Sequence, residues 1–265
     1  MSESARPLAL VTGASSGIGL ELAKQFAQHG FDLVVVAEDD ELEPAAAELR
    51  ALGAAVSPVR ADLTQRAEVE KVVAAYRGSG RPLDAAALNA GVGVAGRFAE
   101  TDLDAELDMV QLNCASTLHL AKRVVQDMVA RDQGRILFTS SVASQAPEPF
   151  QAGYAATKAF VQFLALGIRE ELTGTGVTVT ALLPGPTDTE FFDRADATDT
   201  KLGASDSKDD PAKVAKDGFE GLMKGEASVF AGSVTSKLMG KLSAVLPDAI
   251  TGKSHKPMTR PGSAE

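Results

Sequence analysis

Tyr154 and Lys158 are the two side chains whose types and spacing most directly allow joint chemistry, because they stand four positions apart in a stretch with helical periodicity. That spacing places both side chains on one face of a helix. A phenol with a pKa near 10 is a poor base at neutral pH. A lysine ammonium ~5 Å away, at an effective dielectric of about 20, favours the phenolate by ~3 kcal/mol, or about two pKa units. Since the protonated phenol can also donate to a carbonyl oxygen, the pair predicts acid–base chemistry on an alcohol or a carbonyl.

Two polar residues elsewhere in the chain are candidates to assist this pair. Ser141 lies thirteen residues before Tyr154, directly after a predicted strand, where its hydroxyl can hold a substrate oxygen. Its neighbour Ser140 is interpreted as a turn-forming residue. Asn113 lies inside a long predicted helix, although asparagine is a mediocre helix former. Either it faces solvent or bonds to the backbone, or it is a backbone anchor for a water that leads to Lys158.

A glycine-rich turn near the start of the chain predicts a phosphate site. Thr12–Gly19 contains Gly13, Gly17 and Gly19 in the spacing G-x-x-x-G-x-G. Glycines here let the chain turn tightly, let the backbone approach a pyrophosphate, and let the following helix pack close to the strand. The amides at the helix start carry a partial positive charge toward the anion. Because the turn joins a buried strand to an amphipathic helix, we favour dinucleotide binding over a merely flexible turn.

The acidic end of the second predicted strand bears on which dinucleotide binds. In a fold of this type the residues at this position meet the adenosine ribose. Glu38, Asp39 and Asp40 follow one another here, and Ser16 in the glycine turn is not basic. A 2′-phosphate would require arginine or lysine at this edge, so we expect NAD(H) to be favoured over NADP(H). The alternative is that these acids face solvent and cap the next helix.

Strand-like and helix-like segments alternate along the chain and must position these residues. The alternation predicts an α/β fold, a doubly wound parallel sheet in three α/β/α layers, as a single domain over residues 1–265. The expected strands are Leu8–Val11, Asp32–Ala37, Val56–Arg60, Leu83–Leu88, Arg135–Thr139 and Val177–Leu183. The expected helices are Ile18–His29, Pro44–Leu52, Arg66–Arg77, Glu106–Arg131, Tyr154–Leu172 and Pro211–Lys224.

Two segments depart from the alternation. Residues 187–224 begin with a long stretch rich in Asp, Thr and Ser, and we expect a substrate lid there. Phe191 and Phe192 in this stretch either close over a hydrophobic substrate or anchor the lid to the core. The polar tail 253–265 is expected to be loose.

Composition excludes several classes of function. The net charge of −10 in 265 residues argues against nucleic-acid binding and against a basic membrane-surface helix. One cysteine excludes a disulfide framework and a cysteine-rich zinc site, and three scattered histidines argue against a histidine metal cluster, so we expect no metal. No apolar run approaches the ~20 residues of a membrane span, and the N-terminus lacks the layout of a signal peptide. These features predict a cytoplasmic protein.

The motifs, taken in order, resemble those of a known family. They are TGASSGIG at 12–19, Asp62-Leu63, Asn89-Ala90-Gly91, Asn113, Thr139-Ser140-Ser141, Tyr154 with Lys158, and Pro184-Gly185-Pro186-Thr187. With them the chain resembles the short-chain dehydrogenase/reductase (SDR) family, in the branch of about 250 residues per domain. The resemblance runs from about residue 8 to residue 189 and implies a Rossmann fold.

The same resemblance implies roles for individual residues. Tyr154 would be the acid/base, Ser141 would orient the carbonyl, Lys158 would bind the nicotinamide ribose and lower the tyrosine pKa, and Asn113 would support a proton-relay water. The implied cofactor-binding residues are Gly13, Ser15, Ser16, Gly17, Ile18, Gly19, Ala37, Glu38, Asp62, Leu63, Asn89, Ala90, Gly91, Tyr154, Lys158, Pro184, Gly185, Thr187 and Thr189. Family members usually form homodimers or homotetramers through the two long helices, here 106–131 and 154–172.

We therefore predict an NAD(P)-dependent oxidoreductase that interconverts a secondary alcohol and a ketone or aldehyde by hydride transfer. The alternative from another class is a non-catalytic NAD(P)-binding redox sensor, which would need none of the tetrad. A third reading, an epimerase or dehydratase with bound NAD, would require an added substrate domain. Residues 142–150, the lid and the C-terminal segment are mostly small or apolar with no convergent charged group, and this predicts an uncharged and fairly hydrophobic small-molecule substrate.

Overall fold

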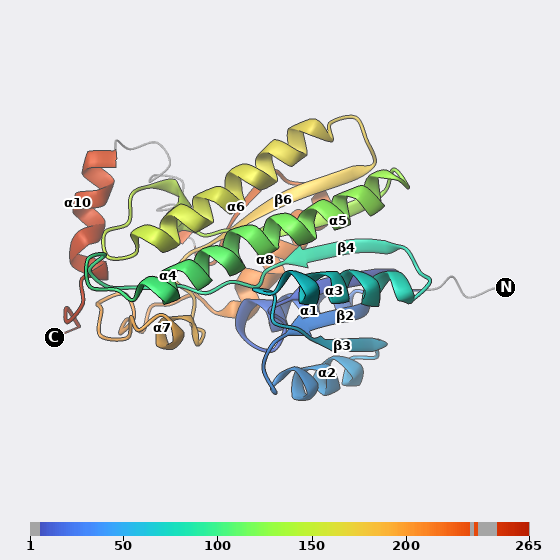
Figure 1. Ribbon diagram of the computed structural model, residues 1–265, viewed down its shortest axis with the longest axis horizontal. Coiled ribbons are helices and arrows are strands. Elements are labelled where there is room, and N and C mark those ends of the chain that lie inside the picture. Colours follow the sequence, from blue (N-terminus) through green and yellow to red (C-terminus); the bar gives the residue numbers. More distant parts are fainter. Residues whose placement is uncertain (1–5, 234–235, 238–247, 265) are drawn as a thin grey trace.

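Short apolar runs, several of them rich in β-branched residues, form the central sheet of the computed structural model, which describes residues 6–233, 236–237 and 248–264 (Figure 1). Within residues 6–233, seven parallel strands pair in the order β3-β2-β1-β4-β5-β6-β7, which confirms the predicted doubly wound Rossmann fold. The strands are β1 (Leu8–Thr12), β2 (Asp32–Ala37), β3 (Val56–Arg60), β4 (Leu83–Leu88), β5 (Gly134–Thr139), β6 (Val177–Pro184) and β7 (Ser228–Ala231). The strand order reverses between β1 and β4, and ligands bind such sheets in the crevice beyond this point.

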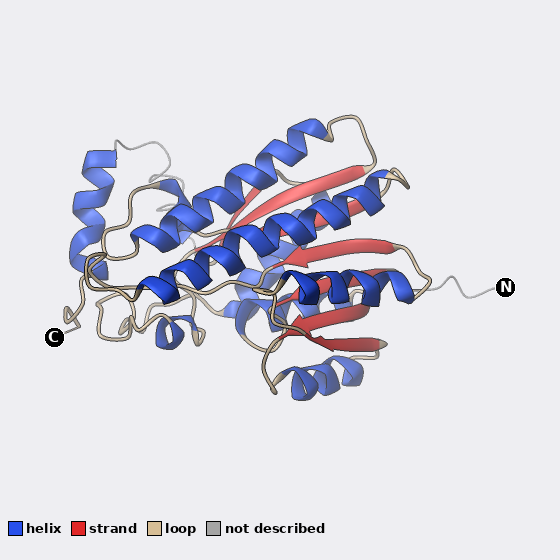
Figure 2. Ribbon diagram, in the orientation of Figure 1, coloured by secondary structure: helices blue, strands red, loops and turns tan. Residues whose placement is uncertain are grey.

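Helices cover both faces of the sheet, because successive side chains of each strand point to opposite faces (Figure 2). In β1, Leu8 and Leu10 pack into one apolar cluster, while Ala9 and Val11 pack into the other. The first cluster includes residues of α3 (Arg66–Gly78), α5 (Thr117–Val129) and α6 (Ala152–Glu171). The second includes residues of α1 (Gly17–Gln28), α2 (Leu42–Ala51) and α8 (Pro211–Lys224).

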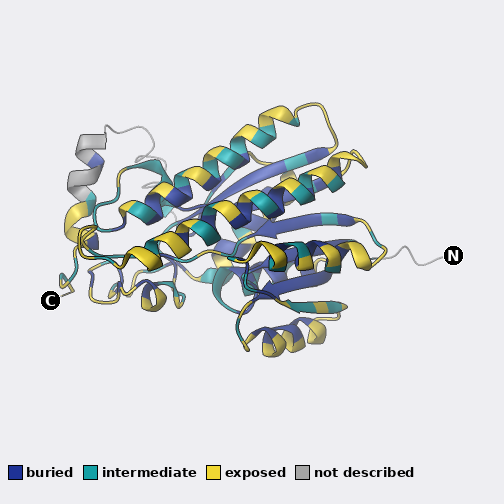
Figure 3. Ribbon diagram, viewed as in Figure 1, coloured by how far each residue is buried: buried dark blue, intermediate teal, exposed yellow. Residues whose placement is uncertain are grey.

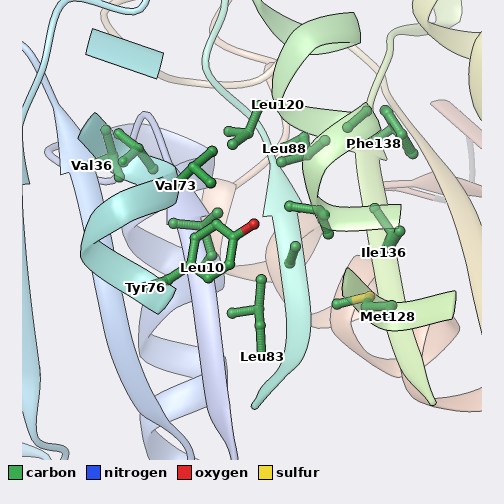
Figure 4. Close-up of a cluster of buried hydrophobic side chains, with 14 of the residues drawn as sticks. Leu10, Val36, Val73, Tyr76, Leu83, Leu88, Leu120, Met128, Ile136 and Phe138 are labelled. Atoms are coloured by element: carbon green, nitrogen blue, oxygen red, sulfur yellow. The ribbon is translucent and has the colours of Figure 1, made fainter. Parts of the chain in front are cut away.

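The core is densely apolar along the central strands, which are buried on both faces (Figure 3). Figure 4 shows Leu10, Tyr76, Ile136 and Phe138 gathered in the first cluster. The phenol of Tyr76 is the one polar group among these four, and it donates to Asp127 Oδ2 at 2.7 Å. Each fully buried large apolar side chain contributes about 1.5–3 kcal/mol to folding. This core therefore holds the carboxyl ends of β1, β4 and β5 rigidly beside one another.

The structure differs from the predicted elements in several places. The expected helix 106–131 is α4 (Leu103–Val110), a π-helical stretch η1 (Gln111–Ser116) and α5 in succession. The strand β7 was not predicted from the sequence. Helix α8 lies inside the range 187–224 expected for a lid, but its apolar face is buried against the sheet, so the segment free to cover a ligand ends near residue 210.

Two further helices, α7 (Phe191–Arg194) and α10 (Asp248–Thr259), lie on the left side of Figure 1. Residues 253–259, expected in a loose tail, therefore belong to a helix. Its end is fixed by the Thr259 hydroxyl, which donates to the Pro149 carbonyl at 2.8 Å, and by the Met258 carbonyl, which accepts from the Leu202 amide at 3.0 Å. No helix in the described part of the chain is both long and apolar enough to cross a membrane.

Candidate active site

A cavity of about 700 Å³ lies at the carboxyl ends of the strands and is lined by the glycine turn, by strand ends and by residues of α6, α7 and α10. It brings together the predicted residues Ser141, Tyr154 and Lys158 with nearly all of the predicted cofactor residues. Asn113 and Asp62 are the two predicted residues outside its lining. The Asp62 carboxylate instead accepts from the amide and hydroxyl of Thr64, at 2.9 and 2.6 Å, and these bonds lower its pKa.

Asn113 occupies the π-helical stretch, which explains an asparagine within an apparent long helix. Its Oδ1 accepts from the Val92 amide at 3.0 Å, and its Nδ2 donates to the Val92 carbonyl at 2.8 Å and to Thr157 Oγ1 at 3.0 Å. The side chain is 1% exposed. Asn113 therefore ties the loop after β4 to α6, the helix that carries Tyr154 and Lys158.

Lys158 is buried, and its position is fixed at both ends of the residue. The ammonium donates to the Thr139 carbonyl at the end of β5, at 3.0 Å, and the Lys158 carbonyl accepts from Ser140 Oγ at 2.7 Å. Burial lowers the pKa of the lysine to about 8. The Lys158 Nζ lies 5.8 Å from the centroid of the Tyr154 ring. Ser140, interpreted as a turn former, thus anchors α6 to the end of β5.

Tyr154 faces the cavity from the first turns of α6, with 9% of its surface exposed. Burial raises the pKa of its phenol to about 12, a hydrogen bond with Ser141 opposes this rise, and the charge of Glu148 adds to it. The sequence argument expected Lys158 to lower this pKa by about two units. In the structure the Lys158 ammonium donates to the Thr139 carbonyl, and desolvation of the phenol is the largest influence on this pKa.

Residues of segment 187–210 line this cavity, and its two phenylalanines make different contacts. The ring of Phe191 lies against the ring of Tyr154, with centroids 5.0 Å apart. Phe192 is 5% exposed and packs into a small apolar cluster with Ala195 and Ala197. One ring therefore lies against the phenol, and the other anchors the segment.

The glycine turn has the shape that a bound pyrophosphate requires. Gly13 and Gly17 have φ values of +65° and +53°, which side chains rarely adopt, and a Cβ on Gly19 would collide with the Gly13 carbonyl. Helix α1 begins here, and the side chain of its N-cap residue, Ser16, makes no capping hydrogen bond. The first amides of α1 thus remain available to an anion, and the residues fit a dinucleotide.

The edge of the cavity beside β2 is lined by Ala37, Glu38 and Asp39. Ser15 Oγ donates to Asp39 Oδ2 at 2.9 Å. The other carboxylate oxygen, Oδ1, is buried and has no hydrogen-bond partner within residues 6–233, 236–237 and 248–264. A buried acceptor without a partner is costly, so this oxygen is suited to receive a hydroxyl of a ligand.

The residues that line the cavity but were not among the predicted site residues include Asp39, Glu148, Arg194 and His255. Asp39 follows predicted residues directly and could have been found from its place at the end of β2. Glu148 and His255 stand 107 residues apart, and nothing in the local sequence signals their pairing. No cluster of three or more His, Cys, Asp or Glu side chains arranged to hold a metal occurs in the part of the chain that the structure describes.

Comparisons with known proteins agree with this arrangement. The short chain dehydrogenase family matches residues 7–200 of the chain. Oxidoreductase UcpA from Salmonella typhimurium is 32% identical over 210 residues, which are 78% of this chain and 76% of that protein.

Two solved structures are similar over most of their length. A short-chain dehydrogenase from Sphingobium yanoikuyae in complex with NADPH is 35% identical with a TM-score of 0.78, covering 84% of this chain and 87% of that one. The bulky-bulky ketone specific alcohol dehydrogenase from Comamonas testosteroni is 29% identical with a TM-score of 0.77, covering 95% and 94%. The predicted family is thus confirmed, and the chain belongs to the short-chain dehydrogenase family of NAD(P)-dependent oxidoreductases.

Proposed function

We propose that the protein interconverts a secondary alcohol and a ketone or aldehyde, with Tyr154 as general acid and base and NAD(H) as the preferred cofactor. The observation that carries the proposal is the convergence of Tyr154, Ser141 and Lys158 in one cavity with an anion-binding glycine turn. A redox sensor without turnover would not need a buried lysine and a buried phenol beside a ligand cavity.

Tyr154 and Ser141 act on the oxygen of the substrate. In reduction, the phenol donates its proton to the carbonyl oxygen, and a pKa raised by burial keeps that proton in place until charge develops. Ser141, whose hydroxyl bonds to the same phenol, holds the substrate oxygen beside that phenol by a hydrogen bond. The nicotinamide, when bound, delivers or accepts the hydride.

Lys158 and Asn113 support the proton transfer without contacting the substrate oxygen. The Lys158 ammonium lies between the Thr139 carbonyl and the tyrosine ring, where its positive charge stabilises a developing phenolate. The amide of Asn113 is fully engaged with Val92 and Thr157. This leaves the backbone carbonyl of Asn113 as the group that would hold the relay water.

The charge at the β2 edge supports a preference for NAD(H). Glu38 and Asp39 line this edge, and the buried Asp39 Oδ1 can accept from a ribose hydroxyl. A 2′-phosphate would meet these like charges. Arg194, a cation at the same edge, lies 2.7 Å from Glu190 and 4.0 Å from Asp39, so its charge is already compensated.

Apolar side chains around Tyr154 support a hydrophobic substrate. Val142, Phe191, Leu202 and Met258 line the cavity beside it. The related Comamonas testosteroni enzyme is named for bulky ketones, which is consistent with this lining.

Exposed apolar side chains on α4, α5 and α6 support self-association through these helices. Leu107 is 56% exposed, Leu118 45% and Phe163 72%, all within the ranges 106–131 and 154–172 that the sequence predicted as an interface. We propose that a second copy of the chain covers them, because removing exposed apolar side chains from water stabilises an association.

Separate titrations with NADH and NADPH, followed by nicotinamide fluorescence, test the cofactor part of the proposal. The chain contains no tryptophan, so the background is low. Tighter binding of NADH is expected, followed by turnover of secondary alcohols with NAD⁺. Tighter binding of NADPH would contradict the preference, and turnover of no alcohol or ketone despite cofactor binding would favour the sensor.

A further inference from the structure

Glu148 and His255 form a buried polar pair in the same cavity as Tyr154, and neither has a role in the chemistry described above. Glu148 lies between η2 (Val142–Gln145) and α6, and His255 lies in α10. Their Oε2 and Nδ1 atoms are 2.6 Å apart. The side chain of Glu148 is 10% exposed and that of His255 is 20% exposed. The fold therefore places a charged pair, mostly withdrawn from water, where a substrate would lie.

Glu148 and His255 line the same cavity as Tyr154, the proposed acid and base. The charge of Glu148 reaches the Tyr154 phenol strongly enough to raise its pKa. The same cavity is also lined by the apolar side chains of Val142 and Met258. Burying charged groups among apolar side chains is unfavourable unless their remaining donors and acceptors are used.

The unused atoms of the pair define what group fits them. His255 Nδ1 faces the carboxylate, so Nε2 remains free and is a donor when the ring is protonated, while the Glu148 carboxylate retains free lone pairs as an acceptor. An anionic substrate group would be repelled by Glu148, and a cationic group would be repelled by the protonated imidazole. A neutral hydroxyl can donate to the free lone pairs of the carboxylate or accept from Nε2–H on the other side of the ring.

We propose that Glu148 and His255 form a subsite that binds a hydroxyl group of the substrate. On the basis of the proposed function, the substrate class is then a hydrophobic ketone, or the matching secondary alcohol, that carries a second hydroxyl away from the reacting carbon. This replaces the expectation that the substrate end holds no convergent charged group. It retains the expectation of an uncharged substrate with an apolar frame.

Matched ketones test the subsite. The probes are cyclohexanone with 4-hydroxycyclohexanone, and 2-decalone with 6-hydroxy-2-decalone, which place the hydroxyl at two distances from the carbonyl. In the wild type, kcat/KM for the hydroxylated ketone is expected to exceed that for its partner by about tenfold or more in one pair, because a site built to bond a hydroxyl rejects the analogue without it. In the double variant Glu148→Leu, His255→Leu the ratio is expected to fall to about one or below.

Thr259→Val is the matched control, since it removes another tether of α10, the bond to the Pro149 carbonyl, and leaves the pair intact. If Glu148 and His255 only fasten α10, the double variant and Thr259→Val will each change kcat/KM for both matched ketones by the same factor. That result would overturn the subsite. Equal kcat/KM within both pairs in the wild type would overturn it as well.

A binding measurement separates the subsite from the proposed reaction. Each ketone is titrated into NADH-loaded Tyr154→Phe protein, and the change in nicotinamide fluorescence gives its Kd without turnover. The subsite is supported if the hydroxylated ketone binds with a Kd about tenfold lower than its partner, and if this preference disappears when Glu148→Leu and His255→Leu are added. This conclusion holds even if the wild type turns over neither compound and the proposed reaction is wrong. Equal Kd values within both pairs overturn the subsite.

Discussion

The substitution Gly91→Ala is expected to displace two of the proposed catalytic residues, Asn113 and Lys158. A Cβ on Gly91 would lie 2.9 Å from Asn113 Oδ1 and 3.1 Å from Lys158 Nζ, both closer than an ordinary contact. Asn113 is held by its bonds to Val92 and Thr157, and Lys158 by its bond to Thr139. The φ of Gly91 is not in the left-handed region, so the effect of the substitution is steric rather than a matter of backbone strain.

The magnitude follows from the bonds that the methyl group would break. Displacing the Asn113 amide removes two or three hydrogen bonds worth about 1 kcal/mol each, so we expect the free energy of unfolding to fall by ~2–3 kcal/mol. At about 2.1 cal/mol/K per residue, the unfolding entropy of a chain this long is roughly 0.56 kcal/mol/K, so the Tm should fall by about 4–5 °C. A shift of Lys158 on the order of 1 Å should reduce kcat about a hundredfold.

Thermal unfolding followed by circular dichroism, with turnover measured in parallel, checks this estimate. Gly167→Ala is the matched control, because Gly167 lies within α6 and an added Cβ there meets nothing within 4 Å. Helix propensity should make that variant more stable by about 0.5–1 kcal/mol, a rise in Tm of roughly 1–2 °C. A Gly91→Ala protein that melts and turns over like the wild type would refute the claim that Asn113 and Lys158 are tightly held.

Three further substitutions are informative. Gly19→Ala should weaken NADH binding by at least tenfold in a fluorescence titration, because the methyl group would collide with the Gly13 carbonyl and move the start of α1; unchanged affinity would contradict the phosphate site. Asp39→Ala should raise NADPH affinity relative to NADH by about tenfold, since it removes a like charge; an unchanged ratio would mean that Asp39 does not face the ribose. Pairing with Glu148 raises the His255 pKa above its ordinary 6.5, so the folded state binds more protons than the unfolded state. The stabilisation by this pair is therefore full below pH 6.5 and is lost as the pH rises through the pKa of the folded state. The Tm difference between wild type and His255→Gln should therefore be larger at pH 5.5 than at pH 9, and an equal difference at both would exclude a charged pair.

The sheet and the glycine turn could be predicted from the sequence because their signals are local. The apolar runs of β1 and β2 are bounded by turns, and Gly13, Gly17 and Gly19 occur at a spacing that only a tight strand-to-helix turn requires. Tyr154 and Lys158 could be placed on one helix face for the same reason.

The remaining features depend on contacts between distant residues. The π-helical stretch at Asn113 forms because its amide bonds to Val92 and Thr157, and helical periodicity does not register these partners. The polar tail 253–265 carries Pro257, which is typical of a loop, yet residues 253–259 are helical. Its pairing of His255 with Glu148 joins residues 107 positions apart. The raised pKa of Tyr154 reflects burial, which only the folded chain shows.

The role of Tyr154 is tested most directly by comparing turnover and cofactor binding in Tyr154→Phe. The substitution removes one hydroxyl and keeps the ring that packs against Phe191. The predicted result is a loss of about 10²–10⁴-fold in kcat on an alcohol that the wild type oxidises, with a Kd for NADH within about threefold of the wild type. A variant that retains turnover within tenfold of the wild type would show that another group exchanges the proton, and the account of this site would be wrong.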